Sequence, residues 1–133
     1  MKVLIDATIW SHVLRRKFRP ENATPQMRVM ELAAEERVAI IGPIRQEVLS
    51  GIREVEQFEL LRDHLRDFED TEITIDDYEQ AALFYNLCRA RGIQGSHTDF
   101  LICAIAVRHD YSIFTTDGDF THYAKILPIT LYS

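Results

Sequence analysis

Acidic side chains lie at the points along this sequence where an α/β protein collects the groups that do its chemistry. Asp6 ends the first apolar run, and Asp117 follows another run at residues 111–115. Glu47 lies in a short predicted helix, and Asp99 lies in the first turn of a longer one. Because the carboxyl ends of parallel strands share one edge of a sheet, we expect these four carboxylates to meet there.

Four carboxylates on one edge repel one another unless a cation compensates their charge. Mg²⁺ suits such a site because it binds a few carboxylates and keeps several of its waters. Two such ions about 4 Å apart stabilise both the attacking and the leaving oxygen in phosphodiester hydrolysis. Thr8, Thr115 and Thr116 add hydroxyls that can orient the carboxylates. The histidines show no spacing typical of zinc, so the pattern favours a hard cation.

Each acid also has a structural interpretation, and single residues leave both interpretations open. Asp6 can cap the helix that follows it, and Asp99 stands three residues after Ser96, as in a capping pair. Glu47 can be an ordinary surface glutamate, and the acids of residues 117–119 can be turn residues. The catalytic interpretation therefore depends on whether the carboxylates meet in space.

The elements that must position these acids alternate along the chain. Short apolar runs predict strands at residues 2–6, 38–41, 72–75, 111–115 and 129–131. Helical spacing predicts helices at residues 9–17, from 24 onward, and at 44–50, 53–68, 76–91 and 96–109, the last of them apolar all round and buried. This alternation predicts an α/β domain with a mostly parallel sheet of four or five strands flanked by helices on both faces.

Several predicted helices carry signals at their ends. Thr24, which precedes a proline, is typical of an N-cap. Asp76 and Glu79 have the spacing of a capping box. Gly51 and Gly92 are expected just past the ends of two helices, where glycine is favoured.

The size and composition of the chain suit a single domain over residues 1–133. Of its residues, 47% are hydrophobic and 27% are charged, as in ordinary globular proteins. The N-terminus lacks the apolar core of a signal peptide, and the longest apolar stretch, residues 100–107, is too short to span a membrane. Cys88 and Cys103 have no metal-ligand spacing, so we expect reduced thiols in a cytoplasmic protein.

The net charge of −6 at first disfavours nucleic acid as a partner, because Lys and Arg dominate phosphate binding. The charges are unevenly distributed, however. Residues 31–80 hold fifteen acidic and five basic residues, whereas residues 1–30 hold six basic and two acidic ones. The N-terminal excess includes a cluster made of Arg15, Arg16, Lys17 and Arg19. This cluster can contact RNA, contact an acidic partner or stay solvated, so the net charge excludes no partner.

Four short motifs, taken in order, resemble those of PIN-domain ribonucleases. They are Asp6-Ala7-Thr8, residues 47–51, Thr98-Asp99-Phe100 and residues 115–120. The resemblance covers essentially the whole chain. The small size and the spacing of the motifs look most like the VapC-type toxins of toxin–antitoxin pairs.

The resemblance implies a PIN-like three-layer domain with endoribonuclease activity. It implies that Mg²⁺ or Mn²⁺ is bound by Asp6, Glu47, Asp99 and Asp117. Asp119 would be a further member of the site, and Thr115 a supporting hydroxyl. The family also implies an RNA substrate, a homodimer, and a VapB-type antitoxin that inserts a peptide near the acidic groove.

Two other functions fit parts of the pattern. A phosphatase of the haloacid-dehalogenase class also has an Asp after its first strand, but it needs a second Asp two residues later, where this chain has Thr8. A non-catalytic PIN-like module that binds only RNA or protein would be expected to have lost some of the acids, and none is missing. The sequence therefore predicts a metal-dependent endoribonuclease.

Overall fold

Four short, parallel strands form one sheet in the computed structural model, which describes residues 1–14 and 23–133. Their order across the sheet is β2-β1-β3-β4. The strands are β1 (Val3–Ile5), β2 (Val38–Ala39), β3 (Ser112–Phe114) and β4 (Thr130–Leu131). Val3 lies opposite both Val38 and Ser112. Because the chain runs from β1 to β2 on one side and returns to β3 on the other, a crevice is expected at the carboxyl ends of β1 and β3.

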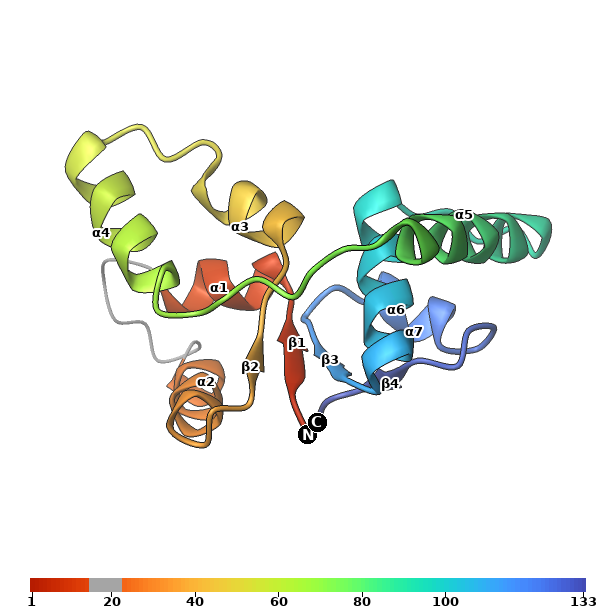
Figure 1. Ribbon diagram of the computed structural model, residues 1–133, viewed down its shortest axis with the longest axis horizontal. Coiled ribbons are helices and arrows are strands. Elements are labelled where there is room, and N and C mark those ends of the chain that lie inside the picture. The colour runs from red at the N-terminus through yellow and green to blue at the C-terminus, as the bar shows by residue number, and fades with distance from the viewer. Residues whose placement is uncertain (15–22) are drawn as a thin grey trace.

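Seven helices flank this sheet within the described residues. They are α1 (Ala7–Val13), α2 (Ala23–Ala34), α3 (Gly42–Leu49), α4 (Val55–Leu65), α5 (Ile75–Ala90), α6 (His97–His109) and α7 (Asp119–Tyr123). None of these described helices has both the length and the apolar character needed to cross a bilayer. Figure 1 shows α1–α4 on one side of the sheet and α5–α7 on the other, with the strands ending in the space between α3 and α6. The predicted α/β fold is confirmed, with four parallel strands.

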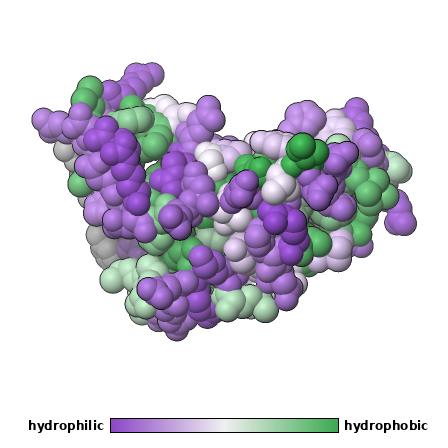
Figure 2. Space-filling model, in the orientation of Figure 1, coloured by the Kyte–Doolittle hydropathy of each residue, from purple (hydrophilic) through white to green (hydrophobic). Residues whose placement is uncertain are grey.

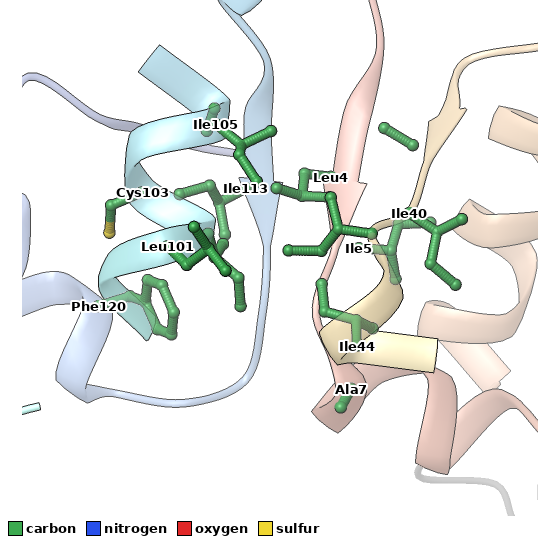
Figure 3. Packing of buried hydrophobic residues seen from close by; sticks show 14 of the residues in the cluster. Leu4, Ile5, Ala7, Ile40, Ile44, Leu101, Cys103, Ile105, Ile113 and Phe120 are labelled. Atoms are coloured by element: carbon green, nitrogen blue, oxygen red, sulfur yellow. The ribbon is translucent and has the colours of Figure 1, made fainter. Parts of the chain in front are cut away.

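Strand β1 and helix α6 form the centre of the hydrophobic core. Residues 3–5 are at most 1% exposed, as expected for an interior strand of a parallel sheet covered on both faces. Residues 100–106 of α6 are all buried, which confirms the prediction of a buried helix. Figure 3 shows Leu101 of α6 beside Ile113 of β3, with Leu4 of β1 on the other side of Ile113. This packing fixes the first turn of α6, which carries Asp99, against the sheet.

The strand predicted at residues 72–75 is wrong. Asp70 makes one isolated parallel bridge with Ile40, and the chain then leaves the sheet and enters α5 at Ile75. The short run at residues 72–75 suggested a strand, but the Thr74 side chain instead accepts a hydrogen bond from the Asp77 N–H at the start of the helix.

The capping box of α5 consists of Thr74 and Asp77, and not of the predicted pair Asp76 and Glu79. The Thr74 hydroxyl accepts a hydrogen bond from the Asp77 backbone N–H at 3.3 Å. The Asp77 carboxylate accepts one from the Thr74 N–H at 2.9 Å. The helix begins one residue earlier than predicted because Thr74, as the N-cap, can satisfy these groups together with Asp77.

An ion pair joins the start of α5 to the end of α6. Asp77 is 1% exposed, and its two carboxylate oxygens accept hydrogen bonds from Arg108 Nε at 2.6 Å and Nη2 at 2.8 Å. Arg108 also donates to the Glu72 carbonyl at 3.0 Å. Burial alone would raise the pKa of Asp77, but the hydrogen bonds from Arg108 and Thr74 outweigh it and hold the pKa below its usual value.

Other helix boundaries were predicted with mixed success. Helix α2 begins at Ala23, so Thr24 lies within its first turn and is not the N-cap. Gly51 and Gly92 stand just past α3 and α5 with φ values of 86° and 76°, which confirms the left-handed helix ends expected there. The basic cluster at residues 15–19 lies outside the described residues.

Candidate active site

Asp6 combines a capping role with a position at the carboxyl end of β1. It is 5% exposed, and its Oδ1 accepts a hydrogen bond from the Ala7 N–H at 2.8 Å, which makes Asp6 the N-cap of α1. The helix therefore begins two residues earlier than predicted. Asp6 Oδ2 accepts hydrogen bonds from the hydroxyls of Thr115 at 2.8 Å and Thr8 at 3.2 Å. The N-cap uses only Oδ1 of Asp6, so Oδ2 is free to accept from Thr115 at the end of β3.

Thr115 connects the ends of the two central strands. Besides donating to Asp6, its Oγ1 accepts a hydrogen bond from the Asp117 N–H at 3.0 Å and lies 3.3 Å from Thr8 Oγ1. The Thr8 hydroxyl accepts one from the Thr116 N–H at 3.2 Å. The loop after β3 is therefore tied to the start of α1, and the predicted hydroxyls of Thr8 and Thr115 both reach Asp6.

Asp99 enters the site from the first turn of α6. Ser96 caps this helix, since its Oγ accepts a hydrogen bond from the Asp99 N–H at 3.1 Å. The Asp99 carboxylate accepts one from the Tyr123 hydroxyl at 2.7 Å. Burial raises the pKa of Asp99, and the negative charges of Asp117 and Asp6 raise it further, whereas the hydrogen bonds from Tyr123 and Ser96 lower it. The net result is a raised pKa.

Glu47 reaches the same region from α3. Buried Ile44 and Val48 anchor this helix to the core, while the Glu47 side chain is exposed. Partial burial raises the pKa of Glu47, and the negative charges of Asp6 and Asp99 add to the effect. Glu47 is therefore not an isolated surface glutamate, because other carboxylates lie within electrostatic reach of it.

Asp117 and Asp119 follow β3 in a tight turn. Asp117 Oδ1 accepts a hydrogen bond from the Asp119 N–H at 2.9 Å, so the turn interpretation of these residues is confirmed. The charge of Asp117 contributes to the raised pKa of Asp99. Asp119 is exposed at the start of α7. The pKa of Tyr123 is raised by burial, by Asp99, and then by the charges of Asp119 and Asp117.

Asp6, Glu47, Asp99 and Asp117 form what we call the acidic group. In the described part of the chain, none of them forms an ion pair with Lys or Arg. In that same part, no three His, Cys, Asp or Glu side chains are placed closely enough to hold a metal ion. The donor chemistry fits a hard divalent cation, because Mg²⁺ needs only one or two carboxylates in direct contact and completes its shell with water.

Sequence patterns did not point to Tyr123, which donates a hydrogen bond to Asp99, or to Gly95, which lies against Tyr123. Tyr123 is 0% exposed at the end of α7. Its spacing from buried Phe120 and Leu127 is that of one helix face, and a tyrosine on a buried face needs a partner for its hydroxyl. That signal could have indicated a buried polar contact. It could not have indicated Asp99 as the partner.

The chain matches known proteins over almost its whole length. A family model described as PIN domain matches residues 3–126. VapC ribonuclease Mb1587 of Mycobacterium bovis and ribonuclease VapC11 of Mycobacterium tuberculosis are each 31% identical to it over 130 residues. Each match covers 93% of this chain and 92% of the relative.

Solved structures share the fold at lower sequence identity. VapBC2 from Rickettsia felis, bound to a DNA fragment from its promoter, matches with a TM-score of 0.77 and 17% identity over 99% of this chain and 98% of that one. FitAcB from Neisseria gonorrhoeae matches with a TM-score of 0.72 and 16% identity over 98% and 96%. A toxin–antitoxin complex from Klebsiella pneumoniae matches with a TM-score of 0.65 and 22% identity over 90% of each chain.

Proposed function

The chain belongs to the PIN domain family, and from this membership we propose that it is a metal-dependent endoribonuclease, the toxin of a toxin–antitoxin pair. The observation that carries the proposal is the acidic group. Its carboxylates come from four separate segments, act on the pKa values of Glu47 and Asp99, and have no basic partner among the described residues. The curated relatives that match nearly the whole chain are named ribonucleases.

The acidic group would hold Mg²⁺ or Mn²⁺, with Asp119 at its edge. When bound, the ion supplies positive charge that favours deprotonation of a water and stabilises the leaving oxygen of the cleaved phosphodiester. The part played by the chain is to hold the carboxylates in place. The Thr115 hydroxyl fixes one oxygen of Asp6, and the start of α6 presents Asp99 from a rigid, buried helix. No side-chain nucleophile is required.

RNA is the proposed substrate, and a VapB-type antitoxin is the proposed partner. The partner assignment is supported by the solved structures that share the fold, which include VapBC2 and another toxin–antitoxin complex. A homodimer and a cytoplasmic location belong to the same proposal. Free, buried thiols at Cys88 and Cys103 are in keeping with a reducing compartment.

Cleavage of RNA by carboxamide variants tests the catalytic part of the proposal. Purified protein is incubated with structured RNA in Mg²⁺, in Mn²⁺ or in EDTA. We expect cleavage by the wild type with either ion and none in EDTA. Asp6→Asn and Asp99→Asn should each abolish it, because each removes a charged ligand from the acidic group.

Asp76→Asn is the matched control, since Asp76 is an exposed acid in α5 outside the acidic group. It should cleave at the wild-type rate. Cleavage that survives both site substitutions, or that continues in EDTA, would show that the protein is not a metal-dependent nuclease acting through these carboxylates. Addition of an equimolar VapB-type antitoxin should stop the wild-type reaction.

A further inference from the structure

Tyr123 contacts the acidic group through one hydrogen bond from a fully buried position. Its hydroxyl donates to Asp99 Oδ2 at 2.7 Å, and the side chain is 0% exposed. Phe100 and Phe120 hold its ring, with centroid distances of 4.9 Å and 5.1 Å at interplanar angles of 47° and 70°. With the ring packed in this way, the hydroxyl has little freedom to turn from Asp99.

Gly95 provides the space that this hydroxyl occupies. A Cβ atom at residue 95 would overlap with the Tyr123 hydroxyl oxygen, lie 2.7 Å from Tyr123 Cζ, and lie 3.0 Å from Phe100 Cε2. Any other residue at this position would therefore push the tyrosine away from Asp99. The requirement for glycine here comes from the lack of room, in contrast to Gly51 and Gly92, where it comes from a positive φ.

We propose that Tyr123 is a positioning residue for the Asp99 carboxylate and that Gly95 makes room for it. The proposal rests on the proposed function, in which Asp99 is a metal ligand. A neutral hydroxyl suits this task, because it orients the carboxylate without cancelling the negative charge that attracts a cation, as an Arg or Lys would. It also links α7, which begins at Asp119, to α6, which carries Asp99.

In a purely structural alternative, the same hydrogen bond satisfies the tyrosine hydroxyl and has no role in positioning the carboxylate. A buried tyrosine hydroxyl needs an acceptor, and Asp99 could serve as that acceptor without any effect on metal binding. The two interpretations differ in one measurable quantity. If Tyr123 positions Asp99, loss of the hydroxyl weakens metal binding. If it does not, loss of the hydroxyl changes only the stability of the fold.

Tyr123→Phe separates these outcomes, because it removes the hydroxyl and keeps the packed ring. Titration calorimetry with MnCl₂ measures the dissociation constant, and thermal melting in EDTA measures stability. We expect Mn²⁺ to bind about tenfold more weakly, in line with other residues that support a metal ligand from behind. RNA cleavage should fall at low Mn²⁺ and recover at high Mn²⁺. Tyr85→Phe, which removes a hydroxyl that contacts Arg89 instead, should bind Mn²⁺ as the wild type does.

Gly95→Ala gives a second route to the same answer and keeps the test valid if Tyr123→Phe folds poorly. It should also weaken Mn²⁺ binding, by displacing the hydroxyl. Combined with Tyr123→Phe it should weaken binding no further, because the two substitutions act through the same group. A lower Tm with an unchanged Mn²⁺ dissociation constant in both single variants would overturn the positioning role alone. A wild type that binds no Mn²⁺ and cleaves no RNA would overturn the proposed function, and the positioning role with it.

Discussion

The carboxylate of Asp99 lowers folding stability in the absence of a cation. Its pKa is raised by partial burial and by the negative charges of Asp117 and Asp6. A carboxyl group with a raised pKa is less stable in its ionised form in the folded protein than in the unfolded chain. At neutral pH the site therefore destabilises the fold until positive charge binds to it.

Asp99→Asn is expected to melt at the same temperature as the wild type or a higher one in EDTA. The gain should be at most about 1 kcal/mol, the size of one interaction between unit charges roughly 4 Å apart in water. Asparagine keeps an oxygen that can accept from Tyr123. Mg²⁺ should raise the Tm of the wild type but not that of the variant.

Asp76→Asn serves as the control for this measurement, because it also removes one acid but lies outside the acidic group. It should keep the full Mg²⁺-dependent rise in Tm. A variant of Asp99 that is less stable in EDTA and still stabilised by Mg²⁺ would mean that Asp99 is only part of the helix start.

At the scale of elements, the start of α5 is held by one charged pair, which joins it to α6, and by one capping box. Asp77 belongs to both, since it accepts from Arg108 and from the Thr74 N–H. These two helices also pack closely along their length. The start of α5 therefore has two separate contributions to stability, and each can be removed by a single substitution.

Thr74→Ala should lower the free energy of unfolding by about 1 kcal/mol, because it removes the side-chain acceptor at the N-cap. Glu79→Ala, at the position suggested by the sequence pattern alone, should change it by less than about 0.5 kcal/mol. Urea denaturation of both variants checks this. Equal losses would mean that the box observed between Thr74 and Asp77 does not stabilise the helix.

Arg108→Met should lower stability by about 2 kcal/mol at neutral pH, because it leaves the buried Asp77 carboxylate without its cation. The value is below that of a fully buried pair, since the Arg108 side chain is 37% exposed. The pKa of Asp77 is lowered in the fold, so its contribution is complete above the unfolded value of about 4 and is lost as the pH falls below it.

Denaturation between pH 7 and pH 2 checks the pH dependence. The stability of the wild type should fall more steeply below about pH 4 than that of Arg108→Met, so that the two curves approach each other. Arg62→Met is the control, because Arg62 pairs with Asp63 on the surface. Its curve should run parallel to that of the wild type.

The elements of the core could be predicted from the sequence, and those outside it less well. The runs that became β1 and α6 are apolar because both are buried on all sides, so their patterns were clear. Apolar and polar residues alternate over residues 72–75, as in a strand, but Thr74 forms the capping box of α5 with Asp77 instead. A local pattern cannot show which backbone groups a side chain will satisfy.

In the candidate site, too, local patterns indicated some residues, whereas contacts made by tertiary packing could not be predicted. Asp6 and Asp117 were singled out because each follows a strand, and Asp99 because it lies in the first turn of a helix. Glu47 lies near the C-terminal end of α3, and a joint role of the four acids stays a prediction. Tyr123 could not be predicted, because its contact with Asp99 depends on how α7 packs on α6 through Phe100. Asp6 also shows that a capping carboxylate can make a second contact, since one oxygen caps α1 and the other accepts from Thr115.

At the scale of the whole molecule, the net charge of −6 is consistent with RNA as a substrate. Only the acidic group and Asp119, of the 21 Asp and Glu residues, have a proposed part in the site. Figure 2 shows a hollow at the top of the molecule, between the side that carries α4 and the side that carries α5, with hydrophilic side chains on both sides. Among the described residues, the carboxylates that raise the pKa values of Glu47 and Asp99 are Asp6, Asp99 and Asp117. The carboxylates of the acidic group would face the RNA directly.

RNA binding by a double variant tests this distribution of charge. Asp6→Asn combined with Asp99→Asn should bind RNA several-fold more tightly than the wild type in EDTA at low salt, because two nearby negative charges are gone. In Mg²⁺ the difference should shrink. Fluorescence anisotropy measures both. Asp63→Asn with Asp76→Asn has the same net charge, and a similar gain in that control would mean that only total charge matters.

The connectivity of the sheet also decides when the candidate site can assemble during synthesis. Strand β1 pairs with residues that come much later, and the hydrogen bond from Thr115 to Asp6 joins groups 109 residues apart. A nascent chain emerges from the ribosome at about 5–20 residues per second, and contacts so distant in sequence form only after the later partner has emerged. Until then Asp6 lacks the hydrogen bond from Thr115, and β1 lacks its pairing with β3. The site is therefore expected to assemble only after β3 and the loop that carries Thr115 and Asp117 have left the ribosome.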